Sequence, residues 1–441
     1  MSESPHPTER AETHSESGVL TGDGAALPRY EAPALHEQSF QFAELQEAVH
    51  PPIAPVWRLA HLEPSPSSRV VGRWLLVMLA VGLMAAVLHA MAEQSAAWLM
   101  GYFGVFVQIT PFALLGFLAY IGVQRTWGVV LAYLWHASMV LSMAATPALM
   151  VFLTFLPPPS AVSPALSPNW PVLAGAAAWG FLGVVAAGLV LMPAVRRLLA
   201  GVLPFDPRSH VHAIALSLVL GGVVMFFGQL IATGGNPVLL ELIKRGESAF
   251  VTGPQELFSS MVYMVLWTVP ASMVAVGFLV TRTWREALER LGLVRPTGRQ
   301  VALGIGVAVG LAGVLLLTEP LFFQLWERMG LPRTDQETFE KILAPAISPL
   351  GAVILGLSAG ISEEVAVRGV LQPRLGILLP NLFFTSLHAF QYGFDGLLIV
   401  FLIGTVLGLV RRATNTTTAC IVHALYDFIL VFASYLTGQT P

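Results

Sequence analysis

Charged residues are scarce in this sequence. Of its 441 residues, 11% are Asp, Glu, Lys or Arg, whereas 55% are hydrophobic. This leaves too little charge to cover the surface of a soluble protein of such length, and it is typical of a multi-pass membrane protein. The net charge of -3 gives no basic excess, so nucleic acid is excluded as a partner. The single cysteine, Cys420, excludes an internal disulfide framework and a cysteine-based zinc site.

Residues 1–70 lack the long apolar runs of the remaining chain and are rich in Glu, His, Pro and Ser. A segment with so few apolar residues cannot bury enough surface to offset the entropy of ordering the chain. It also lacks a basic stretch followed by a short apolar core and a small-residue cleavage site, so we expect no secretory signal peptide. The sequence therefore predicts a disordered, acidic tail that stays in the cytosol.

Long apolar runs make up most of the sequence after the tail. A transmembrane helix needs roughly 20 mainly apolar residues. Eleven runs approach that length, at about 74–92, 98–123, 127–156, 171–195, 211–232, 257–280, 300–318, 349–370, 375–391, 394–410 and 416–437. The sequence therefore predicts an all-α fold, a polytopic transmembrane helical bundle of about eleven spans behind the disordered N-terminal tail.

Arginines near the ends of these runs indicate the orientation of the chain. Lys and Arg are enriched in the short cytoplasmic loops of membrane proteins. A cytoplasmic N-terminus fits the positions of Arg69 and Arg73, of Arg125, and of the group from Arg282 to Arg299. Most of the loops on the opposite side are uncharged, acidic or mixed. We therefore expect a protein of the cell (inner) membrane with its N-terminus inside and its C-terminus outside.

A basic amphipathic segment after Val280 divides the runs into six before it and five after it. Its pattern is typical of a short helix lying along the cytoplasmic interface. We therefore expect an N-terminal six-helix membrane region at 71–280 and a second region at 281–437. Small residues four apart let membrane helices approach closely. In the second region this spacing occurs at Gly306 and Gly310, Gly356 and Gly360, and Gly404 and Gly408.

Two adjacent glutamates and an arginine interrupt the eighth apolar run, at Glu363, Glu364 and Arg368. An ionisable side chain at the bilayer centre costs at least about 2.5 to 3.5 kcal/mol, so this cluster calls for a purpose. Residues four apart share a helix face, whereas adjacent residues point about 100° apart. We therefore expect Glu364 and Arg368 to form a buried pair, and Glu363 to keep a free carboxylate suited to act as a general base.

Two histidines follow on later runs. His388 comes one helical turn after Phe384, and His423 comes one turn before Asp427. Glu363 with His388 would hold and deprotonate a water molecule. His423 with Asp427 would donate hydrogen bonds to a developing oxyanion.

Taken together, the motifs EExxxR, FxxxH and Hxxx(N/D) on successive runs resemble those of the CPBP family of intramembrane proteases. That family includes the type II CAAX prenyl endopeptidases and bacteriocin-processing or self-immunity (Abi) proteins, and it was first described as metalloendopeptidases. The resemblance covers about residues 281–437. It implies an all-helical membrane fold with a polar cavity open toward the cytosol. It also implies hydrolysis of a peptide bond near the C-terminus of a membrane-associated substrate.

The resemblance also implies a role for each motif residue. Matched by position, Glu363 resembles the catalytic glutamate that activates water, Glu364 and Arg368 resemble its supporting pair, His388 resembles the water-positioning histidine, and His423 with Asp427 resembles the oxyanion pair. At position 427 the usual family residue is Asn. Because an ionised Asp cannot donate to an oxyanion, either Asp427 is protonated or it orients His423 as an acceptor.

Carboxylate-activated water needs no metal, so we expect no required cofactor. If a metal is used, its ligands would be Glu363, His388 and His423, and zinc suits such a ligand set. The expected partners are the lipid bilayer and a membrane-associated peptide or protein. A prenylated tail, a secreted peptide, a C-terminal sorting helix and a regulatory membrane protein all fit the pattern.

Two other functions fit parts of the sequence. A catalytically silent relative would act as a membrane scaffold or immunity protein, and such a role would survive Glu363→Ala. A transporter would use the buried Glu, His and Arg as a proton relay. Transport predicts ionisable residues in both halves of the chain, yet the first six runs hold little beyond His89 and His136.

Overall fold

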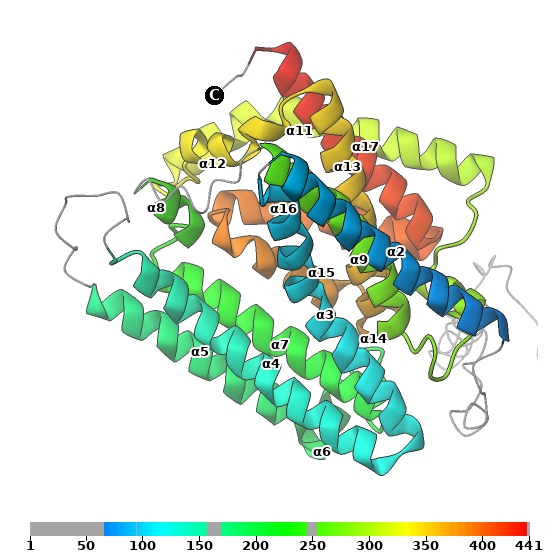
Figure 1. The fold of residues 1–441 in the computed structure, drawn as a ribbon. Coiled ribbons are helices and arrows are strands. Elements are labelled where there is room, and N and C mark those ends of the chain that lie inside the picture. Colours follow the sequence, from blue (N-terminus) through cyan, green and yellow to red (C-terminus); the bar gives the residue numbers. More distant parts are fainter. Residues whose placement is uncertain (1–65, 94, 157–168, 245–253, 439–441) are drawn as a thin grey trace, which may run out of the picture. The chain divides into compact units, whose positions relative to one another are not determined.

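A computed structural model describes residues 66–93, 95–156, 169–244 and 254–438 (Figure 1). Within these ranges every regular element is helical, which confirms the all-α prediction. The predicted tail lies outside them as far as residue 65. The first helices are α2 (Pro66–Ala92), α3 (Ala97–Gln124), α4 (Thr126–Leu153), α5 (Trp170–Leu191), α6 (Pro193–Leu199), α7 (His210–Ala232), α8 (Val238–Lys244), α9 (Pro254–Ala275) and α10 (Trp284–Leu291). The later ones are α11 (Gly298–Arg328), α12 (Gln336–Leu343), η3 (Ala344–Ala346), α13 (Pro349–Glu364), the π-helix η4 (Val365–Leu371), α14 (Gln372–Leu375), α15 (Leu378–Leu387), η5 (His388–Phe390), α16 (Phe394–Ala413) and α17 (Thr416–Leu436).

Ten of the described helical segments are long and apolar enough to cross a membrane. The run predicted as a span at 375–391 is not among them, because the chain turns at Gly376 and then forms α15, a helix of 10 residues. Gly376 has a φ of 76°, which glycine adopts without a steric penalty. A helix of this length covers about 15 Å, half of the hydrocarbon core. The prediction of a full span here was wrong because hydropathy does not reveal where a backbone turns.

Helices α3, α4, α5 and α7 pack in sequence beside one another (Figure 1). Small residues bring α5 and α7 close together, since a Cβ atom added at Gly183 would lie 2.2 Å from Cγ of Met225. Of the ten candidate spans α7 is the most enclosed, with 67% of its apolar window buried. It packs against α15 as well as α5. Helix α7 therefore connects the N-terminal helices to the part of the chain that carries the predicted site.

Helices α13 and α17 cross at two of the predicted glycines. A Cβ atom added at Gly360 would lie 2.5 Å from the backbone nitrogen of Ala424, and one added at Gly356 would lie 2.4 Å from its carbonyl oxygen. Only glycine permits such an approach, so close packing is confirmed at this crossing. The same prediction for Gly306 and Gly310 was wrong. No atom outside α11 lies within 4 Å of a Cβ added at either one, because this face of α11 has no neighbour among the described residues.

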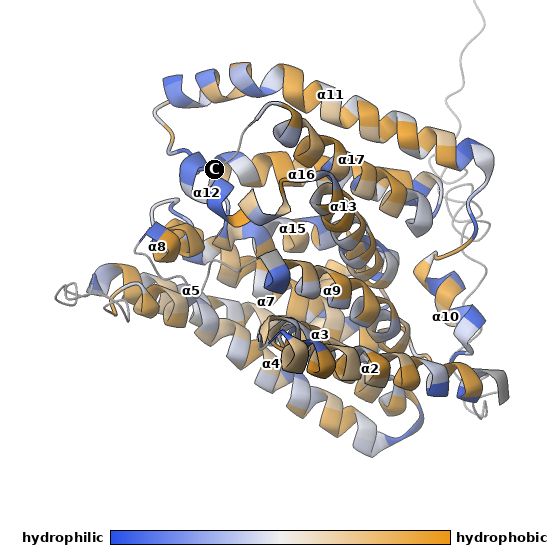
Figure 2. Cartoon of the chain, turned by 45° about the horizontal axis from the view of Figure 1, so that its top comes forward, coloured by the Kyte–Doolittle hydropathy of each residue, from blue (hydrophilic) through white to orange (hydrophobic). Residues whose placement is uncertain are grey.

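The segment after Val280 contains the short helix that its amphipathic pattern predicts. Thr283 and Glu286 form a reciprocal capping box at the start of α10, and Gly292 ends it with a φ of 73°. Ala287 and Leu291 are buried against the bundle. The other side of α10 carries the hydrophilic residues visible in Figure 2.

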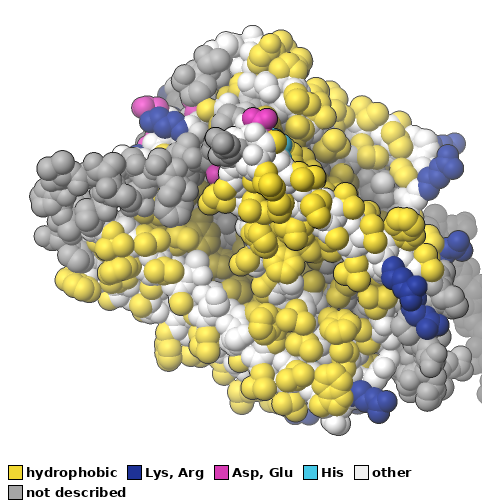
Figure 3. Space-filling model, viewed as in Figure 1, with side chains coloured by type: hydrophobic (Ala, Val, Ile, Leu, Met, Phe, Trp, Pro, Cys, Tyr) yellow, Lys and Arg dark blue, Asp and Glu magenta, His cyan; other side chains and the backbone are white. Residues whose placement is uncertain are grey.

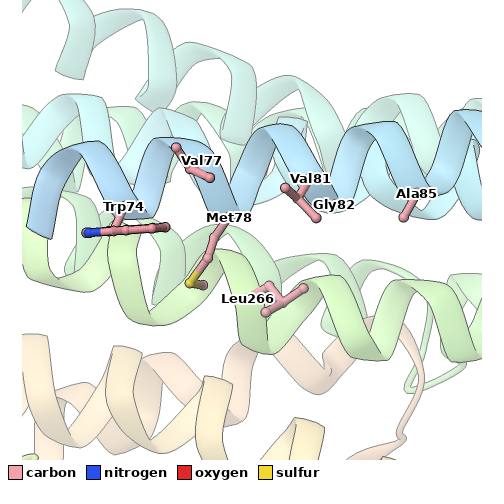
Figure 4. Close-up of a pocket in the computed structure, with 7 residues that line it drawn as sticks. All are labelled: Trp74, Val77, Met78, Val81, Gly82, Ala85 and Leu266. Carbon is pink, nitrogen blue, oxygen red and sulfur yellow. The ribbon is translucent and has the colours of Figure 1, made fainter.

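The outer surface is apolar, as expected of a membrane protein. Figure 3 shows a face covered largely by hydrophobic side chains, with most of its Lys and Arg along the right-hand edge and a further group beside acidic side chains at the upper left. On this surface a pocket of about 390 Å³ lies between α2 and α9, where Trp74, Met78 and Leu266 are among its lining residues (Figure 4). None of the lining residues is ionisable. The pocket therefore offers no side chain for acid–base or nucleophilic chemistry.

Candidate active site

Glu364, at the end of α13, lies at the centre of a buried ionic cluster. Its side chain is 0% exposed, and its Oε1 accepts a hydrogen bond from Nδ1 of His423 at 2.9 Å. The same oxygen lies 3.2 Å from Nη1 of Arg368, whose Nη2 donates to the carbonyl of Gly404 at 2.9 Å. The structure therefore contains the predicted pair of Glu364 and Arg368, and His423 joins it from α17. These contacts tie α13, η4, α16 and α17 together.

His423 faces three carboxylates. Because a carboxylate only accepts hydrogen bonds, Nδ1 of His423 carries a proton and donates a hydrogen bond to Glu364. The other ring nitrogen, Nε2, lies 3.4 Å from Oδ2 of Asp427 and 3.9 Å from Oε2 of Glu363. Nε2 is thus the ring atom available for chemistry, and it lies beside two acidic groups.

Glu363 is the most accessible of these carboxylates. Its side chain is 35% exposed, compared with 18% for Asp427 and 0% for Glu364. Within the described part of the chain, its side chain accepts no hydrogen bond and its ionic contact is the long one to His423. Adjacent residues on a helix point in different directions, which is why Glu363 and Glu364 differ so strongly.

His388 lies in η5, next to Phe384 of α15. Its Nδ1 donates to the carbonyl of Phe384 at 2.9 Å, which leaves Nε2 with its lone pair. The ring of Phe384 lies 4.7 Å from the ring of His388 and also 4.7 Å from the guanidinium carbon of Arg368. Among the described residues no hydrogen bond or ion pair joins His388 to Glu363. The prediction that these two share a water therefore remains a prediction.

Tyr392 was not singled out from the sequence. Its ring stacks on that of His388 at 6.1 Å, and its backbone nitrogen donates to the carbonyl of His388 at 2.9 Å. Burial, followed by the negative charges of Asp427 and Glu363, raises the pKa of Tyr392. The phenol therefore stays neutral and can donate a hydrogen bond near both carboxylates. The available signal was its position one helical turn after His388, the same spacing that separates Phe384 from His388.

The candidate zinc ligands Glu363, His388 and His423 do not assemble into a metal site. Throughout the described ranges, no group of three or more His, Cys, Asp or Glu side chains is arranged to hold a metal ion. We therefore derive no step through a metal.

The helix that carries Arg368 changes type directly after Glu364. Over η4 the backbone hydrogen bonds reach five residues back, as in the bond from the nitrogen of Gln372 to the carbonyl of Val367. A π-helix is rare, and it appears mostly as a single turn within an α-helix at functional sites. Here it places Arg368 against both Glu364 and the carbonyl of Gly404.

The cluster of acidic side chains and histidines lies among helices long and apolar enough to cross a membrane, where ionisable groups typically mark a functional site. Residues 345–429 match the family model described as type II CAAX prenyl endopeptidase Rce1-like. The match confirms the predicted resemblance to the CPBP and CAAX protease family and supports an intramembrane endopeptidase of the CAAX type in general. Together with the many apolar helices, it indicates a multi-pass membrane protein.

The matched segment is narrower than the predicted region at 281–437. It runs from η3 into α17, contains all six predicted site residues and leaves out α10, α11 and α12. Searches of the curated proteins and of the solved structures find no match to the chain.

Proposed function

We propose that this protein hydrolyses a peptide bond of a membrane-associated substrate, near the C-terminus of that substrate, by means of a water molecule activated by Glu363. One observation carries the proposal. Glu363 is the most accessible carboxylate of the cluster, and it lies beside Nε2 of His423, within the segment that matches the CAAX endopeptidase family. A free carboxylate near a histidine is the arrangement that general base catalysis requires.

In the proposed reaction, the carboxylate of Glu363 takes one proton from water while the water oxygen attacks the scissile carbonyl carbon. The carbonyl oxygen becomes an oxyanion, and protonated Nε2 of His423 donates a hydrogen bond to it. The C–N bond then breaks as Glu363 passes its proton to the leaving amine. The second water proton stays with the new carboxyl group, so atoms and charges balance without a further reactant.

The remaining residues position these groups. Glu364 and Arg368 fix the ring of His423 through the 2.9 Å bond to Nδ1. His388 presents a free Nε2 lone pair, which supports the role of holding the water, and Tyr392 stacks on its ring. We also propose that no metal is required, because a carboxylate and an imidazole are sufficient for these proton transfers.

The position of Asp427 favours one of the two roles predicted for it. Its Oδ2 lies 3.4 Å from Nε2 of His423, within reach of a slightly closer approach that would make a hydrogen bond. Before substrate binds, an ionised Asp427 would accept from the protonated Nε2 and hold the ring beside Glu363; during the reaction the oxyanion would replace Asp427 as the acceptor. We therefore propose that Asp427 orients His423 rather than donating to the oxyanion itself.

The test uses three strains, which produce the wild-type protein, the Glu363→Gln variant or the Glu289→Gln variant. In each strain, mass spectrometry measures the C-termini of membrane proteins and the secreted peptides. Glu289 is an exposed glutamate of α10, so its variant controls for the loss of one charge. We expect a processed terminus to be present with the wild type and Glu289→Gln and absent with Glu363→Gln. Inactivation of the wild type by a zinc chelator would refute the metal-free mechanism.

The same experiment separates the proposal from the other functions predicted from the sequence. If the termini are identical in all three strains while a host phenotype depends on the protein, peptide hydrolysis is refuted. A scaffold or immunity role would then keep the phenotype in Glu363→Gln. A proton-coupled transporter would lose the phenotype without any change of termini.

A further inference from the structure

Three arginines from separate segments lie around Tyr120, near the end of α3, and a fourth, Arg411, lies near one of them, Arg290. Nη2 of Arg374 donates to the phenol oxygen of Tyr120 at 2.8 Å, and the guanidinium carbon of Arg282 lies 5.3 Å from the centre of its ring. Arg290 of α10 and Arg411 of α16 complete the group, which we name the arginine cluster. The proposed protease mechanism uses none of the four.

Three members of the arginine cluster bind consecutive carbonyl groups of η4. Pro373 has no N–H, and the N–H of Gln372 is bonded five residues back, so carbonyls near the end of η4 lose their helical donors. Arginine side chains take the place of those donors. Nε of Arg411 donates to the carbonyl of Arg368 at 3.2 Å, Nη1 of Arg290 to that of Gly369 at 3.1 Å, and Nη1 of Arg374 to that of Val370 at 2.6 Å.

In the described part of the chain, no ion pair joins a carboxylate to any of these four guanidinium groups. The ion pairs of Asp335, Glu327, Glu337 and Glu364 are made with other bases. Burial and then the neighbouring charge of Arg374 hold the pKa of Arg290 well below its usual range. Four like charges held together repel one another, which a bound anion would relieve.

The arginine cluster lies at the ends of the candidate spans. Arg374 is one residue from the end of the span 349–375, and Arg411 is in the last turn of α16. Tyr120 is in the last turns of α3, and Arg290 belongs to α10, which is outside the spans. The cluster is therefore at the depth where phospholipid phosphates lie, rather than in the hydrocarbon.

We propose that Arg282, Arg290, Arg374 and Arg411 form a binding site for a phosphate group, that of an acidic phospholipid headgroup. Arginine suits this ligand because its planar fork of N–H donors matches phosphate oxygens. Each arginine uses one N–H for its carbonyl, and Arg374 uses a second for Tyr120. Because three of the four also hold η4, the bound phosphate would stabilise the helix that carries Arg368.

The test uses the purified full chain with mixed phosphatidylcholine and phosphatidylglycerol, and it counts retained lipids by native mass spectrometry. Arg411→Gln is compared with Arg412→Gln, because Arg412 is the next residue and is exposed. We expect the wild type and Arg412→Gln to retain phosphatidylglycerol in preference to phosphatidylcholine. Arg411→Gln should lose about tenfold or more of that preference, as for the loss of a charge-assisted hydrogen bond.

A second variant keeps the test valid if Arg411→Gln does not fold. Arg282 donates to the carbonyl of Val276, outside η4, so Arg282→Gln leaves the three η4 contacts in place. It should show the same loss of lipid preference. Equal retention by the wild type, both cluster variants and Arg412→Gln would overturn the proposal.

Thermal unfolding identifies the source of the phosphate. For the wild type we expect phosphatidylglycerol added to phosphatidylcholine vesicles to raise the melting temperature, and inorganic phosphate with phosphatidylcholine alone to leave it unchanged. A rise with inorganic phosphate alone would overturn the lipid assignment in favour of a free phosphate. Because lipid binding is measured without a peptide substrate, the result is independent of whether the protein is a protease.

Discussion

Glu363 and Glu364 are neighbours in the chain, yet they lie in two contrasting regions of the site. Glu364 is fully buried and shares one oxygen between His423 and Arg368. Glu363 is 35% exposed and lies 3.9 Å from its closest charged partner. One carboxylate is therefore held by structure, and the other is left free.

This contrast separates stability from chemistry. Removing one member of a buried ion pair leaves the other charge uncompensated, so the cost falls on folding. Removing an accessible carboxylate costs little stability, but it removes a proton acceptor. If the two glutamates had the same role, substitutions at both would change stability and cleavage alike.

The largest effect is expected at Glu364. Glu364→Ala should lower the free energy of unfolding by about 3–5 kcal/mol, because it leaves Arg368 buried without its partner. Chemical denaturation of the purified protein in micelles measures this. In the double variant Glu364→Leu with Arg368→Met, part of the loss should be regained, since both charges are gone. A loss below about 1 kcal/mol in the single variant would show that the pair does not hold the site.

Glu363 should show the opposite result. We expect Glu363→Gln to slow cleavage by about 10²- to 10⁴-fold, because the amide cannot take a proton from water. Its free energy of unfolding should stay within about 0.5 kcal/mol of the wild type, as for other accessible positions. Cleavage assays and denaturation of one preparation give both values. Full cleavage by Glu363→Gln would remove this residue from the mechanism.

Asp427 lies between the two extremes, since it is 18% exposed and contacts His423. Asp427→Leu should slow cleavage by about 10²- to 10³-fold, because His423 loses the group that orients its Nε2. Asp427→Asn keeps an acceptor oxygen and should retain cleavage within about tenfold of the wild type. Cleavage rates of the two variants are compared directly. Equal rates for Leu and Asn would mean that Asp427 does not act through hydrogen bonding.

The buried contact between Glu364 and His423 also depends on the crossing of α13 and α17, which brings the two residues together. Gly360→Val should cost about 1–3 kcal/mol, because the new side chain would overlap the backbone of Ala424. Gly310→Val is the matched control on α11, where there is open space, and it should change stability by less than about 0.5 kcal/mol. Denaturation midpoints test the pair, and a similar cost at both positions would refute this account of the crossing.

The smallest effect is expected at an exposed ion pair, which calibrates the buried one. Lys244 lies 2.8 Å from Asp335, and hydrogen bonds from Lys244 and then Thr338 lower the pKa of Asp335 to about 2. Because the folded pKa is depressed, the pair stabilises the protein above pH about 4 and loses that effect as the pH falls toward about 2.

The matched variant is Asp335→Asn, which keeps the cap at the start of α12 while removing the charge. At pH about 6 the wild type should be more stable than this variant by less than about 1 kcal/mol. The difference should shrink as the pH falls below about 4, which melting temperatures at several pH values would show. A difference that grows at low pH would contradict the assignment.

The sequence predicts local relations better than tertiary ones. The pair of Glu364 and Arg368 follows from a four-residue spacing on one helix, and so does the contact between His423 and Asp427. Hydropathy located ten spans because each is a continuous apolar run. In contrast, the hydrogen bond from His423 to Glu364 joins residues 59 apart in the chain, so no periodicity reveals it.

Other features depended on geometry that a single sequence does not encode. Gly306 and Gly310 have the same spacing as Gly356 and Gly360, yet only the second pair has a helix against it. The arginines at 290, 374 and 411 read as loop charges, and their convergence on η4 requires three helix ends to meet. The short α15 results from a turn at a single glycine.

The π-helix η4 determines which side of the helix the residues after it occupy. A single π turn takes up one residue more than an α-helical turn. Relative to a continuous α-helix of the same sequence, every residue after it is therefore displaced by one position, or about 100° of rotation. Deleting one residue between Val365 and Leu371 would restore an unbroken α-helix. The residues on both sides of the deletion would keep their helix faces, so Glu364 and Arg374 would keep their partners, whereas converting the π turn to an α turn without a deletion would turn Arg374 away from Tyr120. The extra residue in η4 therefore keeps the two glutamates and the end of the helix that follows on the faces from which each reaches its partners.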